Sequence, residues 1–270
     1  MKNNMVSPEN QKKMLIDMLK YIDGICRQNN IKYSLIAGSL IGAIRHKGFI
    51  PWDDDVDIVL DYENYNKLMG ILKNTRSDDY DCLFPGQDGY PLRFAKLINK
   101  HTTLREAGLI DEIKNYGLFL DIFCYLNVPN DEKERQKHFK KLSFLGKCLV
   151  KVKLNYNNPS FGKKIVRLSK NFINLIFGNR FFLNKILKLQ TKYMDIKTNY
   201  VMSDNPVYGY KKEVQKAENI KKYIDASFEG IKVMIFENYD EILKNTYGDY
   251  MKLPPESERV NHSLTVYYKE

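Results

Sequence analysis

Three aspartates of this chain stand in segments that otherwise have the pattern of buried β-strand. Asp55 and Asp57 flank a single apolar residue and run directly into the apolar residues 58–60. Alternate side chains of a strand share one face, so both carboxylates leave the same face. Asp121 lies in the middle of a second apolar segment, residues 117–125. A lone buried carboxylate is costly, so the chain must fold into a sheet that supplies these acids with partners.

Two carboxylates on one strand face repel each other unless a cation lies between them. Magnesium prefers oxygen ligands of this kind together with substrate phosphates, and manganese suits the same donors. If the strand of Asp121 lies beside that of Asp55 and Asp57, the acids converge on one or two metal ions, as in in-line phosphoryl displacement. The pattern therefore predicts that these three residues are catalytic and bind Mg²⁺ or Mn²⁺. The alternative is an acidic turn over residues 53–57 and a loop-capping role for Asp121.

A turn suited to phosphate precedes the acids. Gly38 and Ser39 lie between a short apolar run, residues 33–37, and a helical segment, residues 40–46. At such a strand-to-helix turn, backbone N–H groups and the positive helix end favour a phosphate, and glycine permits its close approach. Three cations at the end of that helix are further candidates for phosphate contact: Arg45, His46 and Lys47. The alternative is that they only stabilise the negative end of the helix dipole.

Periodicity and turn residues place the other elements. Ser7-Pro8-Glu9 has the pattern of a helix start, and apolar residues then recur at helical spacing to residue 25. Residues 77–91, rich in Asp, Gly and Pro, are expected to form a loop. Further helices are expected over residues 63–72 and 238–248, and strands over residues 56–60, 92–98, 117–125 and 231–236. This order predicts an α+β fold, with a mixed sheet and flanking helices.

The positive charge of the chain is concentrated in one block. There are 43 Lys and Arg against 33 Asp and Glu in 270 residues, a net charge of +10. Residues 135–194 hold fifteen basic residues and no acid, in a helical pattern broken at residues 157–159 and 178–179. Ordinary surfaces mix both signs, so the block indicates an anionic partner, and we expect peripheral contact with an anionic membrane and no nucleic acid.

The same block has a second interpretation, which depends on its phenylalanines. If these are core, the lysines only solubilise the helices. If they are exposed, the block is a basic amphipathic surface of the kind that lies on membranes. The phenylalanines are Phe139, Phe144, Phe161, Phe172, Phe177, Phe181 and Phe182.

Composition excludes several classes of protein. With 43% hydrophobic and 28% charged residues, the chain is neither disordered nor collagen-like. No uncharged apolar run approaches the roughly 20 residues of a membrane-spanning helix, and the first residues lack the apolar centre of a signal peptide. We therefore expect a cytoplasmic location, peripheral at the inner membrane face. Four widely spaced cysteines are expected to be reduced thiols: Cys26, Cys82, Cys124 and Cys148.

These motifs resemble known families. Gly38-Ser39, the following pair of acids and a later strand aspartate resemble the nucleotidyltransferase superfamily of polymerase-beta type. A closer resemblance is to the LicD family of phosphotransferases, related to the fukutin-like proteins. The matching blocks are AGSLIGAIRHKGFIPWDDDVDIVL (37–60), FAKLINKHTT (94–103), GLFLDIF (117–123), FEG (228–230) and NYDEILKNTYGDYMKLPP (238–255). The chain departs from the family pattern at Ser39, where Thr is commoner, and at Cys124 and Glu237, where Pro is common.

The resemblance implies an activity. It is the transfer of a phospho-aminoalcohol, typically phosphocholine from CDP-choline, with CMP leaving. The acceptor is a hydroxyl of a cell-surface glycan, such as lipopolysaccharide or teichoic acid, or of its lipid-linked precursor. On this interpretation Asp55 and Asp57 hold the metal across the diphosphate, and Asp121 completes the site and orients or deprotonates the acceptor hydroxyl.

The resemblance also implies further donor-binding residues. Lys96 lies within the second block and is a candidate for the phosphates. Trp52, the single tryptophan, either packs as a core aromatic or forms a wall of the nucleotide site. Arg259 and His262 follow the last block and are expected to close over the donor, unless they belong to a frayed tail. The aromatic rings of residues 247–250 suit a quaternary ammonium group.

Three regions follow from these assignments. Residues 1–130 are expected to form a nucleotidyltransferase-like catalytic core, residues 131–200 a basic helical insertion, and residues 201–270 a segment that completes the active site. The same core residues also suit a nucleotidyltransferase that places NMP from an NTP on a small molecule, protein or RNA. A basic binding module without enzymatic activity is a third hypothesis, but it leaves the three strand acids unexplained.

Overall fold

The computed structural model describes residues 4–104, 108, 113–259 and 264–269. Within these residues the core is a seven-stranded mixed sheet with the strand order β1-β2-β6-β4-β3, in which β7 adjoins β6 and β8 adjoins β7. Strands β2 and β6 are parallel and the other neighbours are antiparallel. The strands are β1 (Ser34–Leu35), β2 (Asp57–Asp61), β3 (Tyr80–Leu83), β4 (Ala95–Asn99), β6 (Phe119–Val128), β7 (Tyr200–Ser203) and β8 (Val214–Lys216). The predicted mixed sheet with flanking helices is confirmed.

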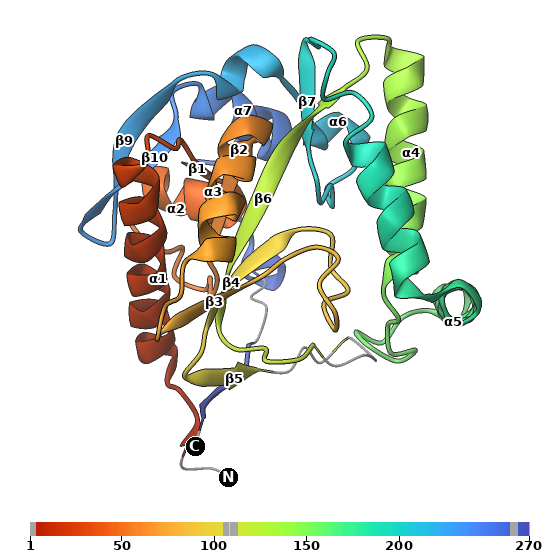
Figure 1. Ribbon diagram of the computed structural model, residues 1–270, viewed down its shortest axis with the longest axis horizontal. Coiled ribbons are helices and arrows are strands. Elements are labelled where there is room, and N and C mark those ends of the chain that lie inside the picture. The colour runs from red at the N-terminus through yellow and green to blue at the C-terminus, as the bar shows by residue number, and fades with distance from the viewer. Residues whose placement is uncertain (1–3, 105–107, 109–112, 260–263, 270) are drawn as a thin grey trace.

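Two small antiparallel pairs flank this sheet. They are β9 (Tyr223–Phe228) with β10 (Ile231–Phe236), and β5 (Thr102–Leu104) with β11 (Val266–Tyr268). The second pair brings the two ends of the chain together, because Met5 also bridges to Tyr267. Both ends consequently lie at the same side of the molecule (Figure 1).

The helices lie on both sides of the long strand β6 (Figure 1). They are α1 (Pro8–Gln28), α2 (Ala37–Arg45), α3 (Tyr62–Asn74), α4 (Glu132–Leu149), α5 (Phe161–Gln190), α6 (Tyr210–Glu213) and α7 (Tyr239–Tyr247), with short 3₁₀ turns at Ala217–Ile220 and Glu256–Glu258. Helix α1 starts where the sequence predicts, since Ser7 Oγ accepts a hydrogen bond from the Asn10 N–H. Helix α7 ends at Gly248, whose φ of 72° suits glycine.

The strand β2 separates two parts of the core. Ile58 and Leu60 pack in the main cluster, whereas Val59 packs in a smaller cluster with Tyr125 and Phe236. The predicted alternation of side chains along this strand is therefore confirmed. Asp57 lies on the face of Val59, which is the face covered by residues from the C-terminal part of the chain.

Helices α4 and α5 pack against each other and against the sheet. Leu142, Phe182 and Ile186 pack there with Val128 and Met202 of the sheet. The predicted breaks are confirmed, because residues 157 and 158 have positive φ before α5 and Gly178, with φ 76° and ψ 156°, divides α5 into two segments. The four predicted thiols are free and buried.

Some sequence predictions were wrong in detail. Strand β3 lies inside residues 77–91, which were expected to be a loop. Helix α2 begins at Ala37, so Gly38 and Ser39 lie in its first turn and not before it. Strands β7, β8 and β9 were also missed. Strands β7 and β8 are short, and β7 pairs with β6, which lies far away in sequence, so these two strands leave little local signal. Strand β9 is longer and forms a hairpin with β10, which follows it directly.

Candidate active site

Two acids and a lysine lie in one row across three neighbouring strands. Asp57 of β2 is directly opposite Asp121 of β6, and Asp121 is directly opposite Lys96 of β4. Facing residues in a sheet have their side chains on the same face and close together. The expectation that the strand of Asp121 lies beside that of Asp57 is therefore confirmed. The backbone links them as well, because the Asp121 N–H donates to the Val56 carbonyl at 3.0 Å.

The lysine of this row is deeply buried and ion-paired. Lys96 Nζ lies 2.5 Å from Asp121 Oδ1, and only 3% of its side chain is exposed. The ammonium also lies 3.3 Å from the ring centre of Phe119 and 5.2 Å from that of Phe94. Such a cation is held by a carboxylate and by aromatic faces together. The carboxylate of Asp121 thus has a fixed partner in the sheet.

The carboxylate of Asp57 is in an unfavourable electrostatic environment. Burial raises its pKa well above the usual value, and the charges of Asp55, Asp121 and Asp53 raise it further, with only Lys96 opposing them. Asp55 is also buried. The protein therefore concentrates negative charge at the start of β2, and a bound cation would relieve this repulsion.

The donor atoms of this cluster suit a hard divalent cation. They are carboxylate oxygens, which Mg²⁺ and Mn²⁺ prefer. Among the described residues, no group of three His, Cys, Asp or Glu side chains is arranged at metal-binding geometry. The carboxylate of Asp121 is paired with Lys96. Asp55 and Asp57 are the acids that fit such an ion best, and the metal remains a prediction.

The first turn of α2 adjoins the acids. Ser39 Oγ accepts a hydrogen bond from the Asp57 N–H at 2.9 Å. At Gly38, an added Cβ would lie 2.5 Å from Asp53 Oδ2, so glycine permits the close approach of the helix to this carboxylate. The positive end of α2 therefore faces the acidic segment and stabilises its negative charge.

Of the three cations at the other end of α2, Arg45 binds backbone carbonyl groups. Arg45 Nη1 donates to the Tyr250 carbonyl at 2.7 Å and to that of Lys252 at 3.3 Å. Its Nε donates to His46 Nε2, and burial together with the charge of Arg45 lowers the pKa of His46. The Lys47 carbonyl accepts a hydrogen bond from the backbone N–H of residue 229. These contacts join α2 to the C-terminal segment, and phosphate binding by the three cations stays a prediction.

Trp52 and Arg259 are brought together, although they are more than 200 positions apart in sequence. The guanidinium lies 4.8 Å from the Trp52 ring, and Arg259 Nε donates to the Pro254 carbonyl at 3.1 Å. Trp52 is partly buried and packs against the main core, so it combines a core contact with a cation–π contact. His262 lies outside the described residues.

The block FEG has a structural role at the β9–β10 turn. Phe228 is fully buried and packs against Phe49, with ring centres 5.0 Å apart. Glu229 Oε1 accepts a hydrogen bond from the Phe49 N–H at 3.0 Å. This turn therefore supports the loop between α2 and the acids.

Two tyrosines lie near the acids, and only one of them was expected from the sequence. The rings of Tyr208 and Tyr247 lie 5.3 Å apart, edge to face. Burial raises the pKa of both hydroxyls, and the negative charge of Asp57 contributes to each shift, which places both rings within electrostatic reach of the cluster. Tyr247 belongs to the aromatic group proposed from the sequence, whereas Tyr208 lies in a loop without any motif. Tyr250 is buried and its hydroxyl donates to Asp240 at 2.9 Å.

A further buried acid, Asp204, directly follows β7. Asp204 is buried, and its N–H donates to the Cys124 carbonyl at 2.8 Å. Burial raises the pKa of Asp204 to about 8, with a further increase from Asp121, although the nearby guanidinium of Arg93 opposes the shift. Arg93 itself donates to Asn205 Oδ1 at 2.9 and 3.1 Å. It thus holds the segment after β7 against the sheet.

The Asp204→Asn variant is expected to lose a pH dependence of stability that the native chain shows. Folding raises the pKa of this acid to about 8, whereas in the unfolded chain it is about 3.9. The folded state therefore binds the extra proton, and stability falls as the pH rises between these values. Asparagine does not titrate. Thermal unfolding of both proteins between about pH 5 and pH 8 checks this, and parallel profiles would contradict it.

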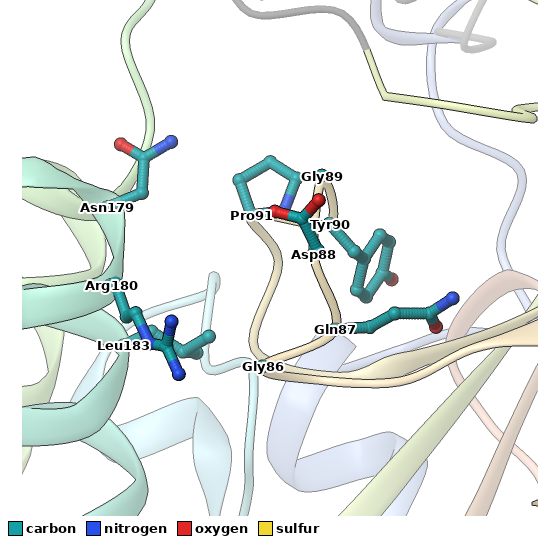
Figure 2. Close-up of a pocket in the computed structure, with 9 residues that line it drawn as sticks. All are labelled: Gly86, Gln87, Asp88, Gly89, Tyr90, Pro91, Asn179, Arg180 and Leu183. Atoms are coloured by element: carbon teal, nitrogen blue, oxygen red, sulfur yellow. The ribbon is translucent and has the colours of Figure 1, made fainter.

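A hollow of about 470 Å³ lies between α5 and the loop before β4. Figure 2 shows Asn179, Arg180 and Leu183 on the helix side, facing the loop that contains Gly86 and Pro91. None of the predicted site residues lines it, so it is distinct from the acidic cluster.

The comparisons with known proteins fit this geometry. A sequence model described as "LicD/FKTN/FKRP, nucleotidyltransferase domain" matches residues 30–144, which contain Asp57, Lys96 and Asp121. Over 271 aligned positions, covering 96% of each chain, the sequence is 31% identical to a protein of Haemophilus influenzae. This chain belongs to the LicD family. The Haemophilus relative is named lipopolysaccharide cholinephosphotransferase LicD.

Two further relatives match a shorter part of the chain. The human and mouse proteins named ribitol 5-phosphate transferase FKRP are each 38% identical over 68 residues. That alignment covers 24% of this LicD family chain and 14% of each relative. The predicted membership of the LicD family is thus confirmed.

Proposed function

We propose that this LicD family member transfers a phosphorylated alcohol to a hydroxyl of a glycan. The row of Asp57, Asp121 and Lys96 carries the proposal, because it places two acids and a cation on one face of a sheet. The full-length similarity to a cholinephosphotransferase and the shorter one to ribitol phosphate transferases support the reaction class. The favoured donor is CDP-choline, with CMP as the leaving group. We also propose that the mixed sheet is a nucleotidyltransferase-type core.

The residues of the row have distinct tasks in this proposal. Asp55 and Asp57 would hold Mg²⁺ or Mn²⁺, which supplies charge stabilisation at the donor diphosphate. Asp121 would orient the acceptor hydroxyl and accept its proton as the oxygen attacks phosphorus and the bond to CMP breaks. Lys96 keeps the Asp121 carboxylate in place through the 2.5 Å ion pair. Arg45, Arg259 and Trp52 are proposed to contact the donor when it binds.

A donor screen tests this function. The chain is incubated with CDP-choline, CDP-ribitol or CDP-glycerol, a glycan acceptor and Mg²⁺ or Mn²⁺, and CMP release and the product mass are measured. We expect CMP with a CDP-alcohol and a mass increase equal to one phospho-alcohol. Pyrophosphate release from an NTP, with NMP on the acceptor, would instead identify a nucleotidyltransferase. Asp57→Asn serves as the inactive control.

Tyr208 and Tyr247 are proposed to recognise the quaternary ammonium group of choline. Residue Tyr208 is 47% exposed, its hydroxyl is within electrostatic reach of Asp57, and aromatic faces attract such cations. We expect Tyr208→Leu to raise KM for CDP-choline about 2- to 30-fold, the range of a cation–π contact. Tyr208→Phe keeps the ring and is expected to stay near the native value. Equal effects of Tyr208→Leu on CDP-choline and CDP-glycerol would contradict the assignment.

The acceptor is proposed to be a cell-surface glycan, such as lipopolysaccharide or teichoic acid, presented on its lipid-linked precursor. A lipid-linked acceptor would require the enzyme to work at the inner face of the membrane. None of the helices in the described part of the chain is long and apolar enough to cross a bilayer. Peripheral contact with an anionic membrane is therefore the arrangement we propose.

A further inference from the structure

The first segment of α5, residues 161–177, has three polar side chains that bind the preceding part of the chain. Arg167 Nη1 donates to the carbonyls of residues 153, 154 and 156, at 3.2, 3.2 and 2.6 Å. Asn171 exchanges hydrogen bonds with the backbone of Val152, at 2.8 and 3.1 Å. Asn174 is buried and donates to the carbonyls of residues 148 and 149. Polar residues at positions i, i+4 and i+7 thus attach this segment to the connection after α4.

The apolar side chains of the same segment are exposed, except for Ile173, which packs against the core between α4 and α5. Phe161 is 80% exposed, Phe172 60% and Leu175 72%. Six exposed apolar residues follow the spacing of one helix face and form what we call the α5 stripe: Phe161, Ile165, Leu168, Phe172, Leu175 and Ile176. A surface helix normally buries its apolar face, so this segment has the inverse arrangement.

The inverse arrangement of apolar and polar side chains ends at the kink, Gly178. After Gly178, the second segment of α5 buries Phe182, Leu183 and Ile186 against α4 and the sheet. Figure 1 shows the two segments of α5 in clearly different directions, with the labelled one at the outer edge of the molecule. The same helix therefore has one segment that packs in the ordinary way and one that leaves its apolar side uncovered.

Basic residues accompany the stripe. Lys163, Lys164 and Lys170 lie in the same segment, which is part of the sixty residues without any acid. At helical spacing Lys164 flanks the stripe, and Lys163 and Lys170 lie on the opposite side. An exposed apolar stripe on a helix that also carries lysines is the composition of helices that lie in the plane of a membrane interface. Anionic lipid head groups complement this charge, and the acyl region accepts the phenylalanines.

We propose that the α5 stripe docks this protein on the surface of an anionic bilayer. A second copy of the chain is a poorer occupant, because it would bring two blocks of fifteen positive charges together. A nucleic acid would match the charge but would leave the apolar residues exposed to water. The kink at Gly178 is followed by Asn179 and Arg180, which line the hollow of Figure 2. Docking would therefore place that hollow close to the lipid surface.

Flotation with lipid vesicles tests the proposal. The full chain is mixed with vesicles of phosphatidylcholine alone or of phosphatidylcholine with phosphatidylglycerol. We expect it to float only with the second kind and to be released by salt, since salt screens the attraction. The triple variant Phe161→Ser, Leu168→Ser and Phe172→Ser is expected to stay at the bottom. The matched control is Ile196→Ser, which removes an apolar side chain that is 54% exposed outside the stripe.

Charge reversal provides an independent variant. Each lysine near an anionic surface is worth about fivefold in partitioning. Lys163→Glu with Lys164→Glu and Lys170→Glu is therefore expected to weaken binding at least about a hundredfold. Circular dichroism of the serine variant and the glutamate variant is the control that checks whether each is folded.

Several outcomes would overturn the proposal. These are no flotation with phosphatidylglycerol vesicles at low salt, equal flotation of the triple serine variant, or dimers in sedimentation that this variant abolishes. The test is separate from the proposed reaction, because CMP release with a soluble acceptor does not require docking. We expect the serine variant to keep that activity within about twofold, since none of its positions contacts the acidic cluster.

Discussion

Asp57→Asn is expected to lower turnover at least about a hundredfold while the protein remains folded. The asparagine keeps the size of the side chain and its position opposite Asp121. It removes the negative charge that a divalent cation at the donor diphosphate requires. Stability is not expected to fall, because the charges of Asp55, Asp121 and Asp53 already disfavour ionised Asp57 in the absence of metal. Initial rates of CMP release and thermal unfolding measure the two effects.

Asp54→Asn is the matched control for this experiment. Asp54 belongs to the same acidic run, but its Oδ2 accepts a hydrogen bond from the Leu264 N–H at 3.2 Å. Its substitution is expected to change turnover only a few-fold. Calorimetry with Mg²⁺ or Mn²⁺ then separates metal binding from catalysis, because Asp57→Asn should weaken binding and Asp54→Asn should not. A fully active Asp57→Asn protein at saturating metal would refute the proposed role.

The acids of the site were predictable because each lies in or next to a segment with the apolar pattern of a buried strand. An aspartate within an apolar strand has few explanations, and the alternation around Val56 fixes which side chains share a face. The structure places Asp57 directly opposite Asp121, as expected if both acids belong to one site. Local signals of this kind also predicted the start of α1, the end of α7 and the break at Gly178.

The contacts between distant segments were not predictable in the same way. Nothing near Lys96 in the sequence indicates that it faces Asp121, because this depends on the register between β4 and β6. Tyr208 reaches the site through a loop after β7, a strand whose pairing is itself non-local. The direction of the phenylalanines in α5 also required the structure. Spacing identifies one face of a helix but not whether that face is covered.

Lys96→Met is expected to destabilise the protein by about 3–5 kcal/mol. Methionine retains the apolar length of the side chain beside Phe119, so the main loss is the ammonium that pairs with Asp121. The carboxylate of Asp121 is then left buried without this cation. An uncompensated buried charge is the main reason why breaking a buried ion pair lowers stability. Urea unfolding in the presence of a chelator measures the change.

The double variant Lys96→Met with Asp121→Leu separates electrostatics from packing. It removes both charges, so we expect it to regain most of the lost stability, whereas turnover stays low because the proposed proton acceptor is gone. If the double variant is as unstable as Lys96→Met, packing of the lysine and not the ion pair explains the loss. Adding Mg²⁺ gives a further discrimination. It should raise the stability of Lys96→Met more than that of the double variant, because only the former retains the Asp121 carboxylate, whose unpaired charge an ion held by Asp55 and Asp57 would offset.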